Sequence, residues 1–114
     1  MTTREDHLAR LTAEREFTAL RLVHLRGDFT DIVAASASSN ADDEHDPEGA
    51  TIAFERSQVQ ALIEQAERRL AEVDAALVRL QEGQYGSCVR CGEPIDPARL
   101  DARPSAVTCI SCAH

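Results

Sequence analysis

The chain has 114 residues, of which 43% are hydrophobic and only 4% aromatic, and its formal net charge is −8. This length predicts one domain with a modest core, and the shortage of aromatic residues favours helix-on-helix packing over a β-sandwich. The excess of acid argues against sequence-specific binding to DNA, whose phosphate backbone attracts basic proteins. The chain lacks an apolar run long enough for a membrane span and begins with the charged stretch MTTREDHLAR, so a cytoplasmic protein is expected.

A first long helix is predicted from about residue 3 to residue 36. Within it, residues spaced alternately three and four apart form one row, which is typical of a helix with a single packed face. This first row consists of Leu8, Leu11, Arg15, Thr18, Leu22, Leu25, Phe29 and Ile32. Gly27 lies inside the helix and costs about 1 kcal/mol relative to alanine, which leaves open a bend or a break at that point.

A polar connector follows at residues 36–51, with the sequence SASSNADDEHDPEGAT. Serine, asparagine and aspartate cluster there with Pro47 and Gly49, and all of these residue types favour turns and helix starts. Residues 41–50 contain five carboxylates and no basic residue. The connector is therefore predicted to be a strongly acidic turn between two helices.

The second helix has the cleaner pattern, because no glycine or proline interrupts it between Ala50 and Gln81. Gly83 stands where a glycine commonly ends a helix. Its row of inward-facing positions consists of Ile52, Arg56, Val59, Ile63, Ala66, Leu70, Val73, Leu77 and Leu80. After Arg56 every member of this second row is apolar, so this helix is the most regular element of the sequence.

Together these elements predict a mainly α-helical protein built on a long antiparallel helical hairpin, or coiled coil, over residues 1–84. Each helix of roughly 32 residues would be about 48 Å long. A short connector would then place the acidic tip, residues 41–50, at the far end of the hairpin. A small cysteine-containing module, residues 85–114, would follow at its base.

The four cysteines of the chain are Cys88, Cys91, Cys109 and Cys112, in the pattern C-x2-C-x17-C-x2-C. This spacing is typical of a four-cysteine zinc site. Two thiolates from each of two tight turns fill a tetrahedral coordination sphere and leave no open position for water, so one structural Zn²⁺ is expected. With so few apolar residues of its own, the module should depend on this metal to fold.

Other uses of these cysteines have less support. Two disulfides are improbable in a chain without a secretory signal, and a thioredoxin-like redox pair would need a βαβ context. Four thiolates could also bind iron, although zinc is the better fit for a structural site. The chain contains no nucleophile–base arrangement and no phosphate-binding glycine loop with supporting context, so an enzyme is not expected.

The cysteine segment resembles the DksA/TraR family of bacterial transcription regulators. The matching residues are Tyr85-Gly86, Cys88-x-x-Cys91-Gly92, Arg99-Leu100-x-Ala102-Arg103-Pro104 and Cys109-Ile110-x-Cys112. The resemblance implies a protein that binds RNA polymerase instead of promoter DNA. It further implies that the coiled-coil hairpin enters the secondary channel, where acidic residues at the tip approach the catalytic centre and modulate initiation. A monomer is expected, because an intramolecular hairpin needs no second chain.

The family's tip motif, Asp-x-x-Asp-x-Ala, falls on His45, Glu48 and Ala50 when it is aligned without gaps from Cys88. The resemblance therefore assigns the polymerase-modulating role to Glu48 and Ala50, with Asp46 supplying part of the missing first carboxylate. Alternatively, residues 42–48 are a solvated acidic loop that caps the second helix, because acids favour a helix N-terminus.

Arg99 and Arg103 are possible partner contacts by the same resemblance. DksA-type members bind the alarmone ppGpp through basic residues, of which Arg103 matches one, whereas two others fall on Glu72 and Ala113. This difference argues against a requirement for the alarmone. The alternative is that the two arginines brace the module or pair with nearby aspartates.

Two other functions remain open from the residues alone. One is a zinc ribbon that binds nucleic acid and carries a coiled-coil oligomerisation arm, although the acidic balance argues against it. The other is a protein–protein adaptor whose long helical face pairs with another helix or with a second copy.

Overall fold

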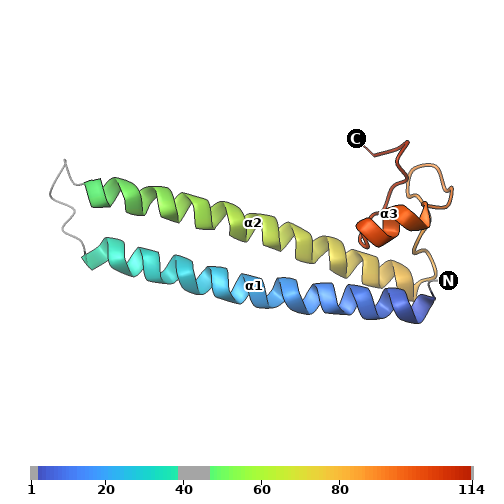
Figure 1. Ribbon diagram of the computed structural model, residues 1–114, viewed down its shortest axis with the longest axis horizontal. Coiled ribbons are helices and arrows are strands. Elements are labelled where there is room, and N and C mark those ends of the chain that lie inside the picture. The colour runs from blue at the N-terminus through green and yellow to red at the C-terminus, as the bar shows by residue number, and fades with distance from the viewer. Residues whose placement is uncertain (1–2, 39–46, 114) are drawn as a thin grey trace. The chain divides into compact units, whose positions relative to one another are not determined.

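The computed structural model describes residues 3–38 and 47–113. It contains three helices, α1 (Arg4–Ser38), α2 (Pro47–Gln81) and α3 (Pro97–Ala102) (Figure 1). The two long helices form the predicted hairpin, and four clustered cysteines follow it. In the described part of the chain no β-strand is present, only one isolated bridge between Ser87 and Pro94. No helix among these described residues is long and apolar enough to cross a membrane.

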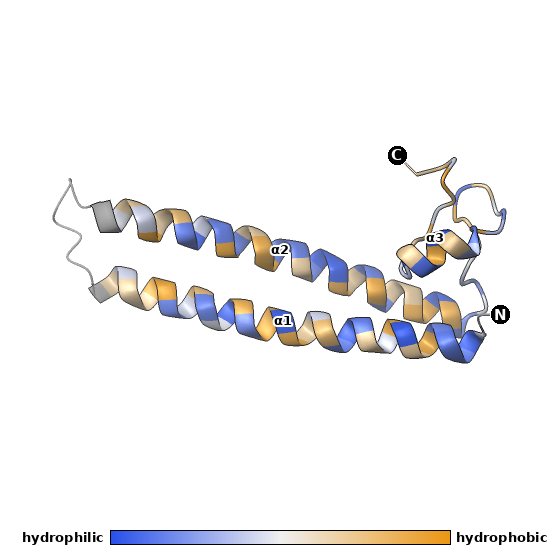
Figure 2. Ribbon diagram, viewed as in Figure 1, coloured by the Kyte–Doolittle hydropathy of each residue, from blue (hydrophilic) through white to orange (hydrophobic). Residues whose placement is uncertain are grey.

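The chain divides into two compact units, and both long helices contribute to each. The first unit combines residues 1–17 with residues 69–114, and the second consists of residues 18–68. Within each unit α1 and α2 pack against one another in antiparallel directions, so their apolar faces meet. Figure 2 shows hydrophobic and hydrophilic residues alternating along both helices, as expected of amphipathic helices.

A capping box begins α1, in which the backbone N–H of Thr3 donates to the Asp6 carboxylate at 3.0 Å. In return, the backbone N–H of Asp6 donates to the Thr3 hydroxyl at 3.1 Å. These contacts use two backbone donors that the first helical turn leaves without partners. The hydrogen bond from the Thr3 backbone lowers the pKa of the Asp6 carboxyl below its ordinary value.

The sign of this shift gives a pH prediction for the start of α1. A lowered pKa means that the stabilisation is present above the unfolded value of 3.8 and is lost as pH falls through the folded value. We expect the first turn to lose helical ¹³Cα shifts over that acidic range, and Asp6→Asn to remove this dependence. Glu5→Gln, a change in the same turn outside the capping box, is the matched control. An unchanged pH profile in Asp6→Asn would contradict the assignment.

The helix α1 runs without interruption through Gly27, so the break that the sequence left open is absent. The helix α2 begins at Pro47, a position where a missing N–H costs nothing because the first helical N–H groups have no helical acceptor. It ends in a Schellman motif, as the glycine predicted. Gly83 has φ +76°, and Gln84 N–H donates to Arg79 C=O at 2.8 Å.

The core of the first unit contains two adjoining clusters. The first joins α1 to the end of α2 and consists of the buried residues Leu11, Val73, Ala76 and Leu80. The second lies inside the cysteine module and consists of Cys88, Ile95 and Leu100. The half-buried ring of Tyr85 packs against both clusters. This aromatic side chain therefore links the module to the base of the hairpin.

The first predicted row is confirmed at Leu11, Thr18 and Leu22, which are buried, but it is wrong at two positions. Leu8 is 42% exposed, and Arg15 is exposed and pairs with Asp74 instead of entering the core. In the second row, Ala76 is buried although the pattern omitted it. An α-helix has 3.6 residues per turn, so positions spaced on average 3.5 residues apart do not stay on one face. This difference explains why some residues of the predicted rows are exposed and others outside them are buried.

The second unit has a thinner core, in which α1 contributes Thr18 and Leu22 and α2 contributes Ile63 and Ala66. Its one ion pair among the described residues, Arg26–Glu67 at 4.0 Å, is exposed on both sides and contributes little to stability. Packing of small and aliphatic side chains therefore holds this unit together.

Candidate metal centre

The four cysteine sulfur atoms lie within 4.8 Å of one another. The Sγ atoms of Cys91 and Cys109 are 3.7 Å apart, and the four cysteines are free thiols. A tetrahedral zinc ion with Zn–S bonds of about 2.3 Å requires sulfur–sulfur separations of about 3.8 Å. The donor set and its spacing therefore fit one structural Zn²⁺, with no position left for a water ligand.

Backbone hydrogen bonds shape the two turns that carry these sulfur atoms. In the first turn, Gly92 N–H donates to Cys88 C=O at 2.9 Å, and Cys88 N–H donates to Glu93 C=O at 2.8 Å. Gly92 has φ +76°, a conformation that glycine adopts without steric cost. In the second turn, Cys112 N–H donates to Cys109 C=O at 3.1 Å. These hydrogen bonds define the two turns that bring the thiols together.

The electrostatics of the cluster also favour a cation. Hydrogen bonds from the backbones of Cys109 and Cys91 lower the pKa of Cys88 to about 6. Hydrogen bonds with the side chains of Cys109 and Cys88 raise the pKa of Cys112 to about 12. Four thiols this close cannot all ionise without a compensating charge, and a divalent metal supplies it.

The short helix α3 connects the two turns. Asp96 caps it by accepting a hydrogen bond from Ala98 N–H at 2.9 Å, and Pro97 stands at its first position. Leu100 points into the core of the module. The interval between the cysteine pairs therefore contains a capped helix of six residues that packs on the core of the module.

Tyr85 fixes the module to the base of the hairpin, within the first unit. Its hydroxyl donates to Pro104 C=O at 2.7 Å, and its ring centroid lies 4.6 Å from that of His7 on α1. Burial raises the pKa of Tyr85, so the hydroxyl remains a donor. The sequence singled out Tyr85 only as part of a family motif, and this structural role follows from its position between two cores.

Arg69 makes a second connection in the same unit. Its guanidinium donates to the Ser105 hydroxyl at 2.9 Å and to both oxygens of the Glu14 carboxylate at 2.7 and 2.9 Å. Arg10 of α1 adds an ion pair to Asp101 at 3.2 Å. Sequence reasoning missed Arg69, Glu14 and Arg10, because no local pattern reveals partners that lie tens of residues away.

The predicted arginines lie on one cavity of about 520 Å³, which Glu72 and Ala113 also line. Arg99 donates through Nε to Thr108 C=O at 2.9 Å and so braces the module. The nearby aspartates are used elsewhere, Asp101 by Arg10 and Asp96 by the cap of α3. The structure thus brings together the three positions that the alarmone argument compared, Arg103, Glu72 and Ala113, and one of them carries a carboxylate.

The predicted tip residues fall at the start of α2. Glu48 and Ala50 belong to its first turn, and Ala50 is exposed. Asp46 lies outside the described residues, as do the acids at positions 42–44.

Comparison with known proteins agrees with the arrangement of the site. The family described as "Prokaryotic dksA/traR C4-type zinc finger" matches residues 83–114. The RNA polymerase-binding transcription factor DksA of Caulobacter vibrioides (strain NA1000 / CB15N) is 46% identical over 41 residues, which is 36% of this chain and 29% of that protein. The protein of that name from Haemophilus influenzae (strain ATCC 51907 / DSM 11121 / KW20 / Rd) is 45% identical over 47 residues, 40% of this chain and 32% of that one. These matches span about a third of the length of the curated relatives.

A solved structure extends the similarity to most of the chain. Transcription factor DksA2 from Pseudomonas aeruginosa superposes with a TM-score of 0.79 and 28% identity, over 95% of this chain and 78% of that chain. Residues 83–114 therefore match the C4-type zinc finger of the DksA/TraR family, and the fold of the chain is similar to that of a transcription factor named DksA2.

Proposed function

We propose that this chain is a transcription regulator that binds RNA polymerase in the cytoplasm and catalyses no reaction of its own. The observation that carries the proposal is the fold shared with a transcription factor over 95% of the chain, together with the matching zinc finger. Two curated relatives are named as RNA polymerase-binding transcription factors. The closed four-cysteine site supports a structural role for the metal, since a catalytic zinc keeps a position open for water.

We further propose that the hairpin enters the secondary channel of the polymerase with its acidic tip leading. Each of its long helices has 35 residues and is about 52 Å long, which suits a narrow channel. The five carboxylates of residues 41–50 supply oxygen atoms of the kind that Mg²⁺ prefers. A tip with this charge would act on the catalytic centre by electrostatics. The acidic chain does not bind DNA directly. It acts as a monomer, because each long helix of the hairpin already packs against the other.

The tip is tested by replacing its two proposed acids with isosteric amides, Asp46→Asn together with Glu48→Gln. We expect this variant to bind purified polymerase with unchanged affinity but to lose its effect on the lifetime of the open promoter complex. The matched control is Asp42→Asn together with Asp43→Asn, which removes the same charge outside the aligned motif. A normal effect of the Asp46/Glu48 variant on open-complex lifetime would refute the tip mechanism.

A further inference from the structure

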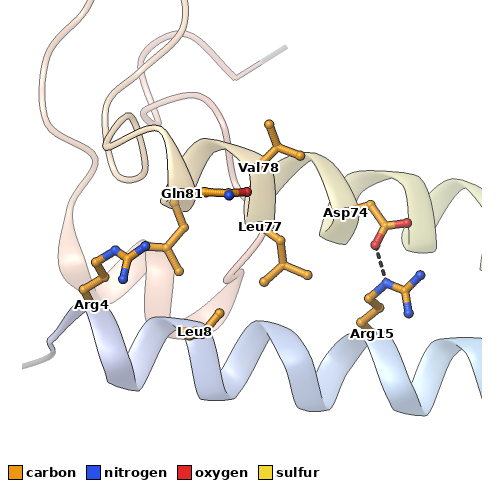
Figure 3. Close-up of a pocket in the computed structure, with 8 residues that line it drawn as sticks. Arg4, Leu8, Arg15, Asp74, Leu77, Val78 and Gln81 are labelled. Atoms are coloured by element: carbon orange, nitrogen blue, oxygen red, sulfur yellow. Dashed lines mark hydrogen bonds and ion pairs between the residues drawn. The ribbon is translucent and has the colours of Figure 1, made fainter.

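A groove between the start of α1 and the end of α2 lies within the first unit, on residues that neither the zinc site nor the tip uses (Figure 3). Its volume is about 470 Å³, which is enough for several side chains of another molecule. Leu8 from α1 and Leu77 and Val78 from α2 form its apolar surface. Leu8 is 42% and Val78 51% exposed, so the groove presents aliphatic carbon to the surroundings.

Charged and polar groups bound the groove at both ends. At one end Arg15 donates through Nε to the Asp74 carboxylate at 2.5 Å, which leaves its terminal nitrogens without a described partner. Arg4 and Gln81 line the other end, and no described residue pairs with the Arg4 guanidinium. The lining therefore contains two guanidinium groups and one carboxylate.

This local balance is the reverse of that of the whole chain, whose net charge is −8. A groove with an excess positive charge beside aliphatic side chains is complementary to a protein segment that combines apolar and acidic residues. A nucleic acid would satisfy the guanidinium groups but would place polar sugar and phosphate against Leu8 and Val78. The aliphatic surface therefore favours a protein as the occupant.

We propose that this groove is a second contact with RNA polymerase, which inserts a segment that places one or two aliphatic side chains next to an aspartate or glutamate. The aliphatic side chains pack on Leu8, Leu77 and Val78, and the carboxylate pairs with Arg4. This assignment rests on the proposed function, because that function supplies the partner. The contact holds the regulator on the enzyme, whereas the tip changes what the enzyme does.

Purified core polymerase and fluorescently labelled full-length chain test the proposal by anisotropy titration. Val78→Asp places a carboxylate against the acidic partner segment, and Arg4→Glu reverses the charge at the open end of the groove. Each is expected to raise the Kd for polymerase by about tenfold or more. The increase for Arg4→Glu should shrink at high salt, because the interaction that it removes is electrostatic. Both residues are exposed, and zinc content together with circular dichroism verifies that the variants fold.

The matched controls are Val89→Asp and Arg90→Glu, which make the same two changes at exposed positions of the cysteine module outside the groove. They should bind polymerase with a Kd within about twofold of that of the unchanged chain. If Val78→Asp and Arg4→Glu also bind within this range, the groove is not a contact and the inference is overturned, while the proposed function stands. If the unchanged chain does not bind polymerase, the proposed function fails and this occupant fails with it.

Discussion

Removal of the metal is expected to unfold the cysteine module while α1 and α2 remain helical. The hydrophobic core cluster of the module has three buried residues, Cys88, Ile95 and Leu100, and one of them is itself a zinc ligand. Too little apolar surface is buried there to offset the ordering of about thirty residues, so the free energy of metal binding becomes free energy of folding. The two long helices keep the apolar contacts that they make with each other.

The measurement combines a chelator titration with NMR and circular dichroism. We expect one zinc per chain by elemental analysis, and loss of amide dispersion for residues 85–113 once the metal is removed, with most of the helical ellipticity retained. Cys109→Ser should produce the same state without a chelator. Ser111→Ala, an exposed change within the same turn, should retain both zinc and dispersion. Retained dispersion of the module after complete removal of zinc would show that the metal does not hold it.

Leu11→Ala is expected to lower the free energy of unfolding by about 2–5 kcal/mol. Leu11 is fully buried against Val73, Ala76 and Leu80, so its truncation leaves a cavity where α1 meets α2. A domain of this size has a total stability of about 5–15 kcal/mol, so the loss is a large fraction of the whole. The same core cluster packs against Tyr85, and its loosening should therefore also weaken the attachment of the zinc module.

Urea denaturation followed by circular dichroism measures this loss. Leu20→Ala is the matched control, because it makes the same truncation in the same helix at a side chain that is 58% exposed. Its effect on the free energy of unfolding should stay within about 0.5 kcal/mol. Equal losses in the two variants would mean that burial at position 11 does not stabilise the hairpin.

The helical hairpin and the zinc ligands could be predicted from the sequence because their signals are local. Apolar residues repeat at the helical period over two stretches, Gly83 stands at a helix end, and each cysteine pair spans a single turn. The structure confirms these elements, with α1 at Arg4–Ser38 and α2 at Pro47–Gln81. The assignments of the tip and of Arg103 rest on the family resemblance and stay predictions.

No local sequence pattern could predict which side chains pair with one another in the folded chain. Arg69 bonds to Glu14, 55 positions earlier, and to Ser105, 36 positions later. Such pairs depend on how far one helix is shifted along the other. The repeat of apolar residues within a single helix does not determine that shift. Arg15 shows the consequence, since its spacing placed it in the core whereas the register places it beside Asp74 at the surface.

The sequence by itself therefore determined the two long helices, the glycine end of the second one and the residues that can bind a metal, because backbone dihedral angles and ligand spacing are set over a few residues. It did not predict α3, and it placed the start of α2 too late, since that helix begins at Pro47 inside the predicted connector. Tertiary structure alone decided that Ala76 is buried while Leu8 is exposed, that Tyr85 joins the module to the hairpin, and that a groove lined by Arg4 remains between the helices. The physical reason is that burial and ion pairing depend on which face of each helix its neighbour covers. The covered face is determined by how the surfaces of the two helices pack together. The period of apolar residues in either helix does not determine it.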